Sequence, residues 1–478
     1  MAGRFLNAFK PIARVIPEIK APERRVRFNE KLFWTALAAI IYLVMAEVPL
    51  FGVQRTALGE LAALRIIFAS NRGTLAELGI GPIVTGGLIL QLLIGSAMIE
   101  CDMSNPEDRQ LFTTASKVFA IVLTGIQALA YIIGGMYGTL QPSMAIIVFL
   151  QLLAAGIIIL LLDELVQKGW GFGSGISLFI LAGVAQRIFW DCFAVTAPVD
   201  EYGSSGFFVA LFQTLSSGQH PITGLLVRGQ YPSMLGFIAT IAAFLIIIYA
   251  EGVRVELPLS YAGYKGFRSR YPIKLLYVSN LPVIFASALF ANIYFFSQLF
   301  WNFYNRNNEI FWFNLLGQFS PMYDNQGNLT GYRPSGGLVY YVTSPGNFAT
   351  AMEDPIRTVG YIAILVAFCA FFSLIWLEVG GLGPSTVAKQ LVDAGMQIPG
   401  YRRSEKAVEP ILKRYIPTVT VLGGIIVGLI AGVSDVLGVF GSGIGIMLSV
   451  GIIYQYYEIL TRERVSEMYP AFRKIFGE

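Results

Sequence analysis

Long apolar runs, separated by polar segments, fill the chain from residue 32 to residue 457. Each run holds about the 20 residues that an α-helix needs to cross a bilayer, because the helix rises about 1.5 Å per residue. The pattern predicts ten spanning helices, at Leu32–Phe51, Leu78–Ile99, Val118–Tyr137, Met144–Leu162, Gly171–Trp190, Met234–Ala250, Val278–Phe300, Val359–Leu377, Tyr415–Val433 and Leu437–Tyr457. We therefore expect an all-α polytopic membrane protein rather than a soluble domain with an anchor.

One apolar stretch is too short for this pattern. Glu60–Ser70 reads ELAALRIIFAS and would rise about 16 Å as a helix, roughly half of the hydrocarbon core. Arg65 lies in its middle. Two interpretations fit these residues equally well. The stretch could be an amphipathic helix on the membrane surface, or a short segment that folds back into the protein.

The composition agrees with a membrane protein and narrows its chemistry. Of the 478 residues, 55% are hydrophobic and 13% are charged, whereas a soluble protein carries about a quarter charged residues. Three scattered cysteines and a single histidine, His220, form neither a metal cluster nor a disulfide framework, so we expect no cofactor and no metal. The basic, proline-broken N-terminus lacks the apolar core of a cleavable signal, and we expect the first span to act as the targeting signal.

The basic residues predict the orientation of the chain. If the N-terminus is cytosolic, 26 of the 34 Lys and Arg residues fall on the cytosolic side. The positive-inside rule therefore predicts that both termini are cytosolic. The cytosolic loops 251–275 and 378–414 are long and basic, and the loops 191–233 and 301–358 on the other side are long and polar.

A short repeat relates the two halves of the chain. Gly173–Ile176 and Gly441–Ile444 both read GSGI, and each begins the last helix in a set of five. The two sets face the membrane in opposite directions, so the repeat predicts two pseudo-symmetric inverted halves with the functional site between them. The glycines do not indicate a nucleotide loop, because no strand precedes them and no Gly-Lys pair occurs in the chain.

Several longer stretches carry a family resemblance. They extend from residue 17 to residue 458 and read PEIKAPERRVRF, EVPLFGV, ASNRGTLAELGIGPIVTGGLILQLLIG, GGMYG, DELVQKGWGFGSGISLFI, YPIKLLYVSNLPVIF, KQLVDAGMQIPGY, RYIPTV and GSGIGIMLSVGIIYQYYE. With these stretches the chain resembles the SecY family, the alpha subunits of the Sec protein-conducting channel, and its eukaryotic members more than its bacterial ones. The resemblance implies a passive channel and not an enzyme. Such a channel passes nascent secretory polypeptides across the endoplasmic reticulum membrane and releases membrane segments laterally into lipid.

The resemblance also implies how the pore closes. In this family the segment after the first helix folds back as a plug, which favours that interpretation of ELAALRIIFAS and places a short plug helix at about 55–72. A ring of aliphatic side chains seals the pore, because such a ring dewets when narrow and offers ions no ligand. For a single isoleucine, lipid contact or core packing is the ordinary role, and only the resemblance and the repeat, which aligns Ile180 with Leu448, favour the ring. The ring positions are Ile80, Val84, Ile176, Ile180, Ile284 and Leu448.

Two polar sets follow from the same resemblance. Helices two and three part from helices seven and eight at a lateral gate, which polar residues tie weakly. The matching residues are Thr85, Gln127 and Asn292, although each could be a satisfied structural residue. Charges linked to the orientation of signal sequences match Arg65, Arg72, Glu77 and Glu378, of which Arg72 and Glu77 could equally be an ordinary interfacial pair.

The basic cytosolic loops form a fourth set. Their Lys and Arg residues lie near aromatic residues, a combination that suits phosphate contact and base stacking. In the simplest interpretation these charges only set the topology. The family docks the ribosome here, which implies contacts to rRNA through Lys265, Arg268, Arg270, Arg402 and Arg403.

The resemblance further implies partners and a domain organisation. The partners are small beta and gamma translocon subunits, the ribosome, nascent polypeptides with their signal sequences, membrane lipid, post-translational translocation factors and a lumenal chaperone. The expected organisation is a cytosolic amphipathic N-terminal segment at 1–31, an N-terminal half at 32–190, a lumenal loop at 191–233, a C-terminal half at 234–457 and a cytosolic tail at 458–478.

Two other classes of protein are alternatives to the channel. A secondary transporter for a small solute would also fit ten helices in an inverted repeat, with Glu47 as its proton or cation site. Glu47 lies near the end of its helix, without an obvious cationic partner, and a small-solute carrier has no need of two long basic loops. An intramembrane enzyme needs a catalytic dyad, and no predicted helix offers paired Asp residues, a Ser/His set or HExxH.

Overall fold

The computed structural model describes residues 11, 17–53, 73–95, 98–99, 101, 106–134, 137, 140–196, 200–217, 222–229, 231–261, 268–278, 281–323, 329–397 and 404–468. Its helices are α2 (Phe28–Glu47), α4 (Gly81–Gly95), α5 (Pro106–Ile133), α6 (Pro142–Leu165), η2 (Val166–Trp170), α7 (Gly175–Phe193), α8 (Phe207–Ser217), η3 (Ile222–Leu225), α9 (Met234–Gly252), α10 (Leu281–Tyr304), α11 (Phe311–Leu316), α12 (Leu338–Val342), α13 (Phe348–Glu353), α14 (Pro355–Val379), α15 (Pro384–Asp393), α16 (Glu405–Val436) and α17 (Gly443–Met468). Its strands are β1 (Arg254–Tyr261), β2 (Arg268–Lys274), β3 (Gln318–Tyr323), β4 (Leu329–Gly336) and β5 (Met396–Gln397).

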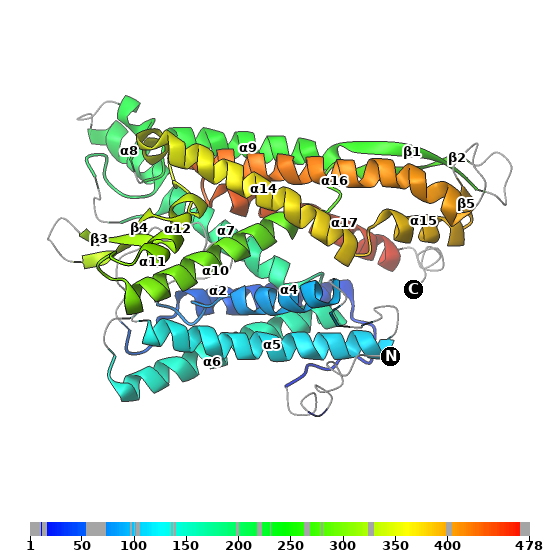
Figure 1. The fold of residues 1–478 in the computed structure, drawn as a ribbon, viewed down its shortest axis with the longest axis horizontal. Coiled ribbons are helices and arrows are strands. Elements are labelled where there is room, and N and C mark those ends of the chain that lie inside the picture. The colour runs from blue at the N-terminus through cyan, green and yellow to red at the C-terminus, as the bar shows by residue number, and fades with distance from the viewer. Residues whose placement is uncertain are drawn as a thin grey trace.

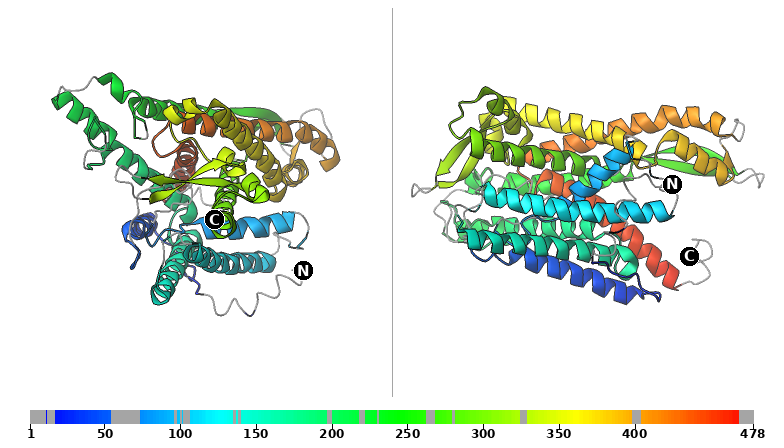
Figure 2. Two further views of the ribbon diagram at one scale, coloured as in Figure 1. Left: turned by 60° about the vertical axis from the view of Figure 1, so that its left-hand side comes forward. Right: turned by 60° about the horizontal axis from the view of Figure 1, so that its bottom comes forward.

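The long helices form a bundle with two halves (Figure 1). Helices α2, α4, α5 and α6 lie on one side of the bundle, and α9, α14 and α16 lie on the other, a separation that the rotated views keep (Figure 2). Helix α17 lies between them and contacts α2, α7, α9 and α16. We call the end that carries β1, β2 and β5 the sheet end, and the opposite end, which carries β3 and β4, the far end.

The predicted spans correspond to ten helices of this bundle. In the described part of the chain, nine helices are long and apolar enough to cross a membrane. The tenth, α4, is shorter than predicted, because the run Leu78–Ile99 contains a helix of only 15 residues, about 22 Å long. The residues before it form turns, with Gly73 and Gly79 at φ of 68° and 51°, a left-handed conformation that helix residues do not adopt.

Each GSGI motif is a turn whose third residue begins a central helix. In the first half Asp163, in the last turn of α6, accepts a hydrogen bond from the backbone nitrogen of Ile176 at 2.9 Å. In the second half Asp435, in the last turn of α16, accepts one from the backbone nitrogen of Gly443 at 2.6 Å. Helix α7 begins at the sheet end and α17 begins at the far end, so one local arrangement occurs twice with opposite direction. This is the inverted repeat that the sequence predicts.

The two long basic loops are joined in one sheet. Strand β1 pairs antiparallel with β2, which comes from the same loop, and also with β5, which comes from the other loop. The second pairing joins Ser260 to Gln397 and Tyr261 to Met396. Helices α5 and α16 start about ten residues before their apolar runs, and their polar first turns also lie at this end.

The segment before α2 is tied to the sheet end of the first half. Residues 17–27 have no regular secondary structure. The indole nitrogen of Trp170 donates to the carbonyl of Lys20 at 2.9 Å, and the ammonium of Lys168 contacts the carboxylates of both Glu18 and Glu164. These contacts place the described part of the N-terminal segment against η2 and the end of α6.

The loops predicted at the far end contain structure of their own. The loop 191–233 holds the amphipathic helix α8, whose Phe207 is buried and whose Phe212 is 73% exposed. The loop 301–358 holds α11, α12, α13 and the antiparallel pair of β3 and β4. These elements surround the far ends of α10 and α14.

Candidate functional site

All six predicted ring residues belong to one hydrophobic cluster between the halves. They come from the start of α4 and from α7, α10 and α17, and are Ile80, Val84, Ile176, Ile180, Ile284 and Leu448. Ile80, Ile180 and Leu448 are at most 1% exposed, and the other three are half-buried against them. Two sets of helices far apart in the sequence thus place these aliphatic side chains in the same buried cluster, which also contains aromatic residues such as Phe179 and Phe290.

Ile80 lies in the turn before α4, whereas the sequence pattern placed it inside the second spanning helix, Leu78–Ile99. Its carbonyl accepts the backbone N–H of Val84 at 3.0 Å, so the two residues still have the i, i+4 relation of a helical face. The turn is tied back to α2, because the backbone nitrogen of Ala76 donates to the carbonyl of Met45 at 3.2 Å. The shortened helix therefore keeps both side chains in the cluster.

A seam between the two halves runs along α4. Helix α4 packs on α5 in its own half and contacts α10 and α14 of the other half. The predicted gate residues Thr85, Gln127 and Asn292 lie on α4, α5 and α10, and all three are half-buried. The amide of Asn292 donates to the carbonyl of Ala288 in its own helix at 2.8 Å. In the part of the chain that the structure describes, no hydrogen bond joins the three side chains.

The predicted orientation charges divide into two groups. Arg65 and Arg72 lie outside the described residues. Glu77 is 4% exposed and accepts hydrogen bonds from the backbone nitrogen of Gly73 at 2.9 Å and from the hydroxyl of Tyr137 at 2.8 Å. It therefore ties the turn before α4 to the chain that follows α5. Glu378 is exposed in the last turn of α14, at the sheet end.

Of the five predicted rRNA contacts, the structure describes only Arg268 and Arg270. Lys265, Arg402 and Arg403 are outside the described residues, and Arg268 begins β2. Arg270 is exposed, and its guanidinium donates to the carboxylate of Glu256 on β1. This hydrogen bond holds the pKa of the Glu256 carboxyl below its ordinary value, so the carboxylate stays ionised beside the basic tip.

Glu47, the candidate site of the transporter hypothesis, is a surface residue. It is the last residue of α2, it is exposed, and its Oε1 accepts a hydrogen bond from the amide of Gln186 on α7 at 2.5 Å. A coupling site for protons or cations needs a carboxylate within the membrane interior or a buried cavity. The structure gives Glu47 neither environment.

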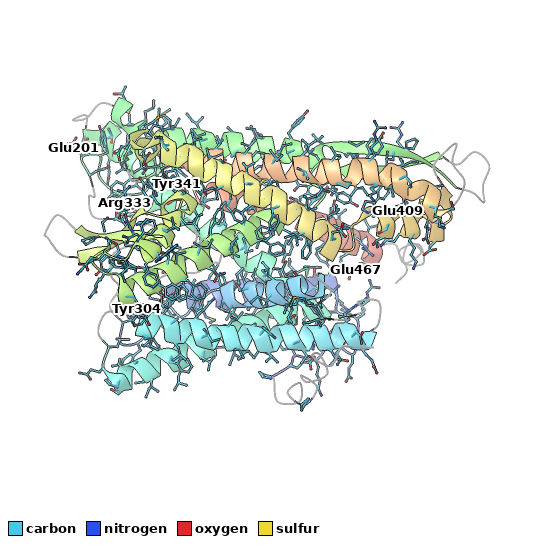
Figure 3. All side chains as sticks on the ribbon, in the orientation of Figure 1. Glu201, Tyr304, Arg333, Tyr341, Glu409 and Glu467 are labelled. Atoms are coloured by element: carbon cyan, nitrogen blue, oxygen red, sulfur yellow. The ribbon has the colours of Figure 1, made fainter. Side chains whose placement is uncertain are left out.

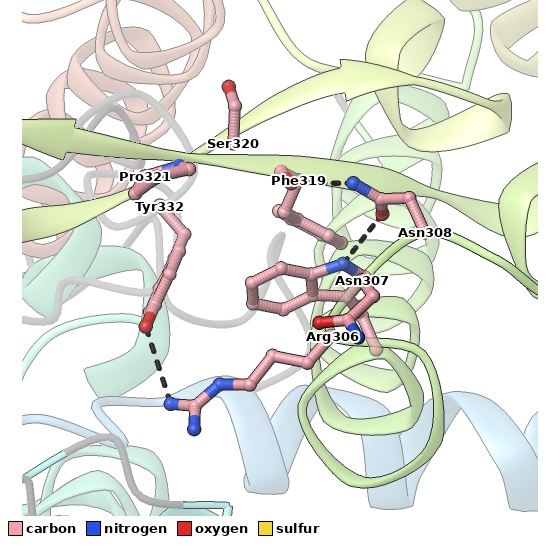
Figure 4. A pocket seen from close by; sticks show the side chains of 8 residues that line it. Arg306, Asn307, Asn308, Phe319, Ser320, Pro321 and Tyr332 are labelled. Atoms are coloured by element: carbon pink, nitrogen blue, oxygen red, sulfur yellow. Dashed lines mark hydrogen bonds between the residues drawn. The ribbon is translucent and has the colours of Figure 1, made fainter.

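A cluster of aromatic and amide side chains supports the far end of α10, which the sequence pattern treated only as the start of a loop. Trp301 is 2% exposed and packs on Phe319 and Tyr332, with ring centroids 5.4 and 4.8 Å away. Its indole nitrogen donates to the Oδ1 of Asn308 at 2.8 Å, and the amide of Asn308 donates to the carbonyl of Phe319 at 3.3 Å (Figure 4). A cavity of about 330 Å³ opens beside this cluster. Tyr304, the last residue of α10, marks this end of the bundle in Figure 3.

The two carboxylates that cap the central helices were also missed. Asp163 and Asp435 are buried, and Asp435 accepts a second hydrogen bond, at 2.6 Å, from the hydroxyl of Tyr361 on α14. The sequence does hold a signal for them. A carboxylate near the end of an apolar run, followed within about a dozen residues by GSGI, occurs once in each half.

Two inverted sets of spanning helices that meet in one buried cluster, with α4 of one half against α10 and α14 of the other, have the architecture of a protein-conducting membrane channel. The chain belongs to the SecY family, because the family model SecY matches residues 74–457. The model for the plug domain of Sec61p matches residues 40–73. That match includes the stretch Glu60–Ser70, which lies outside the described residues, and it favours the plug interpretation over an interfacial helix.

Solved structures agree with this assignment. A structure described as a protein-conducting channel is 36% identical, with a TM-score of 0.79, and the match covers 96% of this chain and 98% of the other. Sec61 in the canine ribosome–channel complex from the endoplasmic reticulum is 35% identical, with a TM-score of 0.77 and the same coverage. The idle yeast Ssh1 complex bound to the yeast 80S ribosome is 28% identical over 96% of this chain and 94% of that one, with a TM-score of 0.75. The predicted family and fold class are confirmed.

Proposed function

We propose that this chain is the pore-forming subunit of a eukaryotic protein translocon. It passes nascent secretory polypeptides across the membrane of the endoplasmic reticulum and releases membrane segments sideways into lipid. The observation that carries this proposal is the buried cluster in which helices of both halves bring the six aliphatic ring residues together, beside the contacts of α4 with α10 and α14. A constriction of this kind suits a substrate whose side chains vary in size and charge.

The proposed seal has a simple physical basis. A polypeptide pore must pass every kind of side chain and yet retain ions when it is idle. Aliphatic side chains meet both needs, because they yield to a passing chain, exclude water when the pore is narrow, and offer no ligand to an ion. The six ring residues are proposed to form this seal, with the plug at about 55–72 as its second layer.

The finer assignment to the endoplasmic reticulum rests on similarity and on charge. The canine Sec61 match supports a eukaryotic channel of this membrane. The ion pair of Lys31 with Glu463, at 2.6 Å, brings the start of α2 and the end of α17 together at the sheet end, beside the basic loops. One charged end of the bundle carries both loops and both terminal helices, which supports cytosolic termini and a ribosome on that side. The beta and gamma subunits, translocation factors and a lumenal chaperone are proposed partners on the basis of family membership.

Site-specific photocrosslinking tests the proposed function. A photoreactive amino acid is placed at Ile80, Ile180 or Ile284, one at a time, in microsomes that carry ribosomes stalled on a secretory nascent chain. We expect each position to form adducts with the nascent chain. Ile158 on α6, which is 44% exposed on the outer face of the bundle, is the control and is expected to form none. Adducts of equal strength from Ile158, or none from the three cluster positions, would contradict a polypeptide pore at this cluster.

The sheet formed by β1, β2 and β5 gives a prediction about ribosome binding. Replacing Arg270 with alanine is expected to weaken binding and to lower its salt dependence by about one released ion, because one phosphate contact is lost. Replacing Glu256 with glutamine is expected to strengthen binding, since the guanidinium then has no competing carboxylate. Affinities of purified ribosomes for the channel in lipid nanodiscs, taken at several salt concentrations, measure both effects.

The control for this prediction is Arg254→Ala. Arg254 also faces Glu256, at 3.5 Å, but it begins β1 at the membrane end of the strand. It is therefore expected to leave ribosome affinity close to that of the unchanged chain. If Arg270→Ala and Arg254→Ala weaken binding equally, the sheet tip has no special role in docking.

A further inference from the structure

The far end of the seam carries contacts that none of the predicted gate residues makes. The side-chain amide of Asn302 on α10 donates to the backbone carbonyl of Gly134, the residue that follows α5, at 3.0 Å. Two turns earlier on α10, the ring of Phe295 packs against Tyr131 of α5, with centroids 5.1 Å apart. These contacts join residues 168 and 164 positions apart in sequence, from opposite halves of the bundle.

The acceptor at Gly134 is available because a helix ends there. The last carbonyls of a helix have no partner within the helix, and Gly134 directly follows the last residue of α5. A buried carbonyl in that position needs a donor from elsewhere. The amide of Asn302 fills this need, so parting the two helices leaves the carbonyl without the partner that the closed seam provides.

The position of Asn302 is fixed by the cluster at the end of α10. Its neighbour Trp301 is held by Phe319 and Tyr332 and by the hydrogen bond to Asn308. The end of α10 is thereby anchored to the β3–β4 pair in its own half. A side chain on an anchored helix end can hold the end of α5 in the other half, and we call this pair of contacts a clasp.

The clasp is also weak in a way that suits a gate. The Oδ1 of Asn302, on the same amide that donates to Gly134, is buried without a hydrogen-bond partner among the described residues. Buried acceptors without partners oppose the closed state, and they gain partners when water or a polypeptide backbone enters the seam. The closed seam therefore gains one hydrogen bond and one aromatic contact, but it leaves the Oδ1 of Asn302 without a partner among the described residues.

We infer that Asn302 and Phe295 form a far-end clasp of the lateral gate, which sets how hydrophobic a segment must be to open it. This inference rests on the proposed function and adds two residues to it. An apolar segment that enters the seam replaces the Phe295–Tyr131 contact with its own side chains and separates Asn302 from Gly134. Segments rich in leucine do so readily, because each leucine favours the membrane by about 0.5 kcal/mol.

Translocation of a graded series of signal sequences tests the clasp. Reconstituted channels receive one secretory protein whose signal carries a stepwise increasing number of leucines. Asn302→Ala is expected to raise translocation of the marginal signals about threefold, the factor that one interhelical hydrogen bond of about 0.6 kcal/mol gives. Strong signals are expected to be unchanged, because they open the gate of the unaltered chain fully.

Matched variants separate the clasp from a general loss of structure. Asn307→Ala makes the same change on an exposed residue, whose amide donates to Glu309 at 3.4 Å, and is expected to leave the threshold in place. Phe295→Leu is expected to lower the threshold as Asn302→Ala does, whereas Phe296→Leu, on a side chain that is 49% exposed, is not. The phenylalanine pair decides the question if Asn302→Ala fails to fold.

Each outcome of this experiment has a definite meaning. Lower thresholds for Asn302→Ala and Phe295→Leu, with both controls unchanged, support the clasp. Thresholds equal to that of the unaltered chain, or equal shifts in the controls, overturn it while leaving the channel intact. If the unaltered chain translocates none of the series, the proposed function fails, and this result is distinct from failure of the clasp.

Discussion

Replacing Ile180 with asparagine is expected to make the idle channel leak ions. The side chain is 1% exposed, within the hydrophobic cluster that also holds Ile284 and Leu448 of the other half. Asparagine is smaller and polar, and it removes an apolar contribution of about 1.5–3 kcal/mol. If that free energy keeps water out of the constriction, leakage should rise roughly ten- to a hundredfold. Single-channel conductance of the purified chain in planar bilayers, without ribosomes, measures this leak.

The control for the leak is Ile180→Leu, which keeps both the volume and the apolar character of the side chain. We expect its idle conductance to match that of the unaltered chain. An asparagine variant that remains as tight as the leucine variant would show that the cluster is ordinary core packing. The seal would then belong to the plug alone.

The second large effect concerns stability, at Asp435. Its two carboxylate oxygens accept hydrogen bonds from the hydroxyl of Tyr361 and the backbone nitrogen of Gly443, both at 2.6 Å, and the residue is 3% exposed. Asp435→Ala leaves both donors buried without partners, at a cost of about 1–3 kcal/mol for each. We expect the free energy of unfolding to fall by about 2–6 kcal/mol. Thermal unfolding in detergent, followed by tryptophan fluorescence, measures the loss.

Two variants test the reason for this loss. Asp435→Asn keeps an acceptor for the backbone of Gly443 and is expected to lose less than half as much stability. Asp163→Ala removes the equivalent cap in the first half and is also expected to lose less, because its partner Gln167 is exposed and can bond to water instead. If all three variants unfold alike, the buried hydrogen bonds of Asp435 are not what stabilises this turn.

Hydrophobic runs predicted the spanning helices well because crossing a bilayer is a local requirement. A run of about 20 apolar residues satisfies it without reference to the rest of the chain. The one span that differs, Leu78–Ile99, begins within turns that follow the plug segment, where Gly73 and Gly79 take left-handed conformations. The length of an apolar run predicts whether a segment partitions from water into the membrane. It does not predict the residue at which the helix begins, which is Gly81 for this span.

The predicted site residues also differ in how well the sequence placed them. The ring residues were assigned by family resemblance and by the GSGI repeat, and the structure gathers them in one cluster. The polar gate residues were assigned in the same way, yet the amide of Asn292 bonds within its own helix. A hydrogen bond that does cross the seam joins Asn302 to Gly134, and neither residue carries a pattern in the sequence.

The sequence by itself determined the membrane class, the ten spans, the inverted halves and the family, because each of these follows from residues near one another in the chain or from long collinear motifs. Only the tertiary structure decided which polar groups meet. It joined the two basic loops through β1 and β5, placed Asp435 against Tyr361 of another helix, and set Asn302 against the end of α5. Hydrogen bonds between residues so far apart depend on how the helices pack, because a buried donor takes whichever acceptor the packing brings within reach.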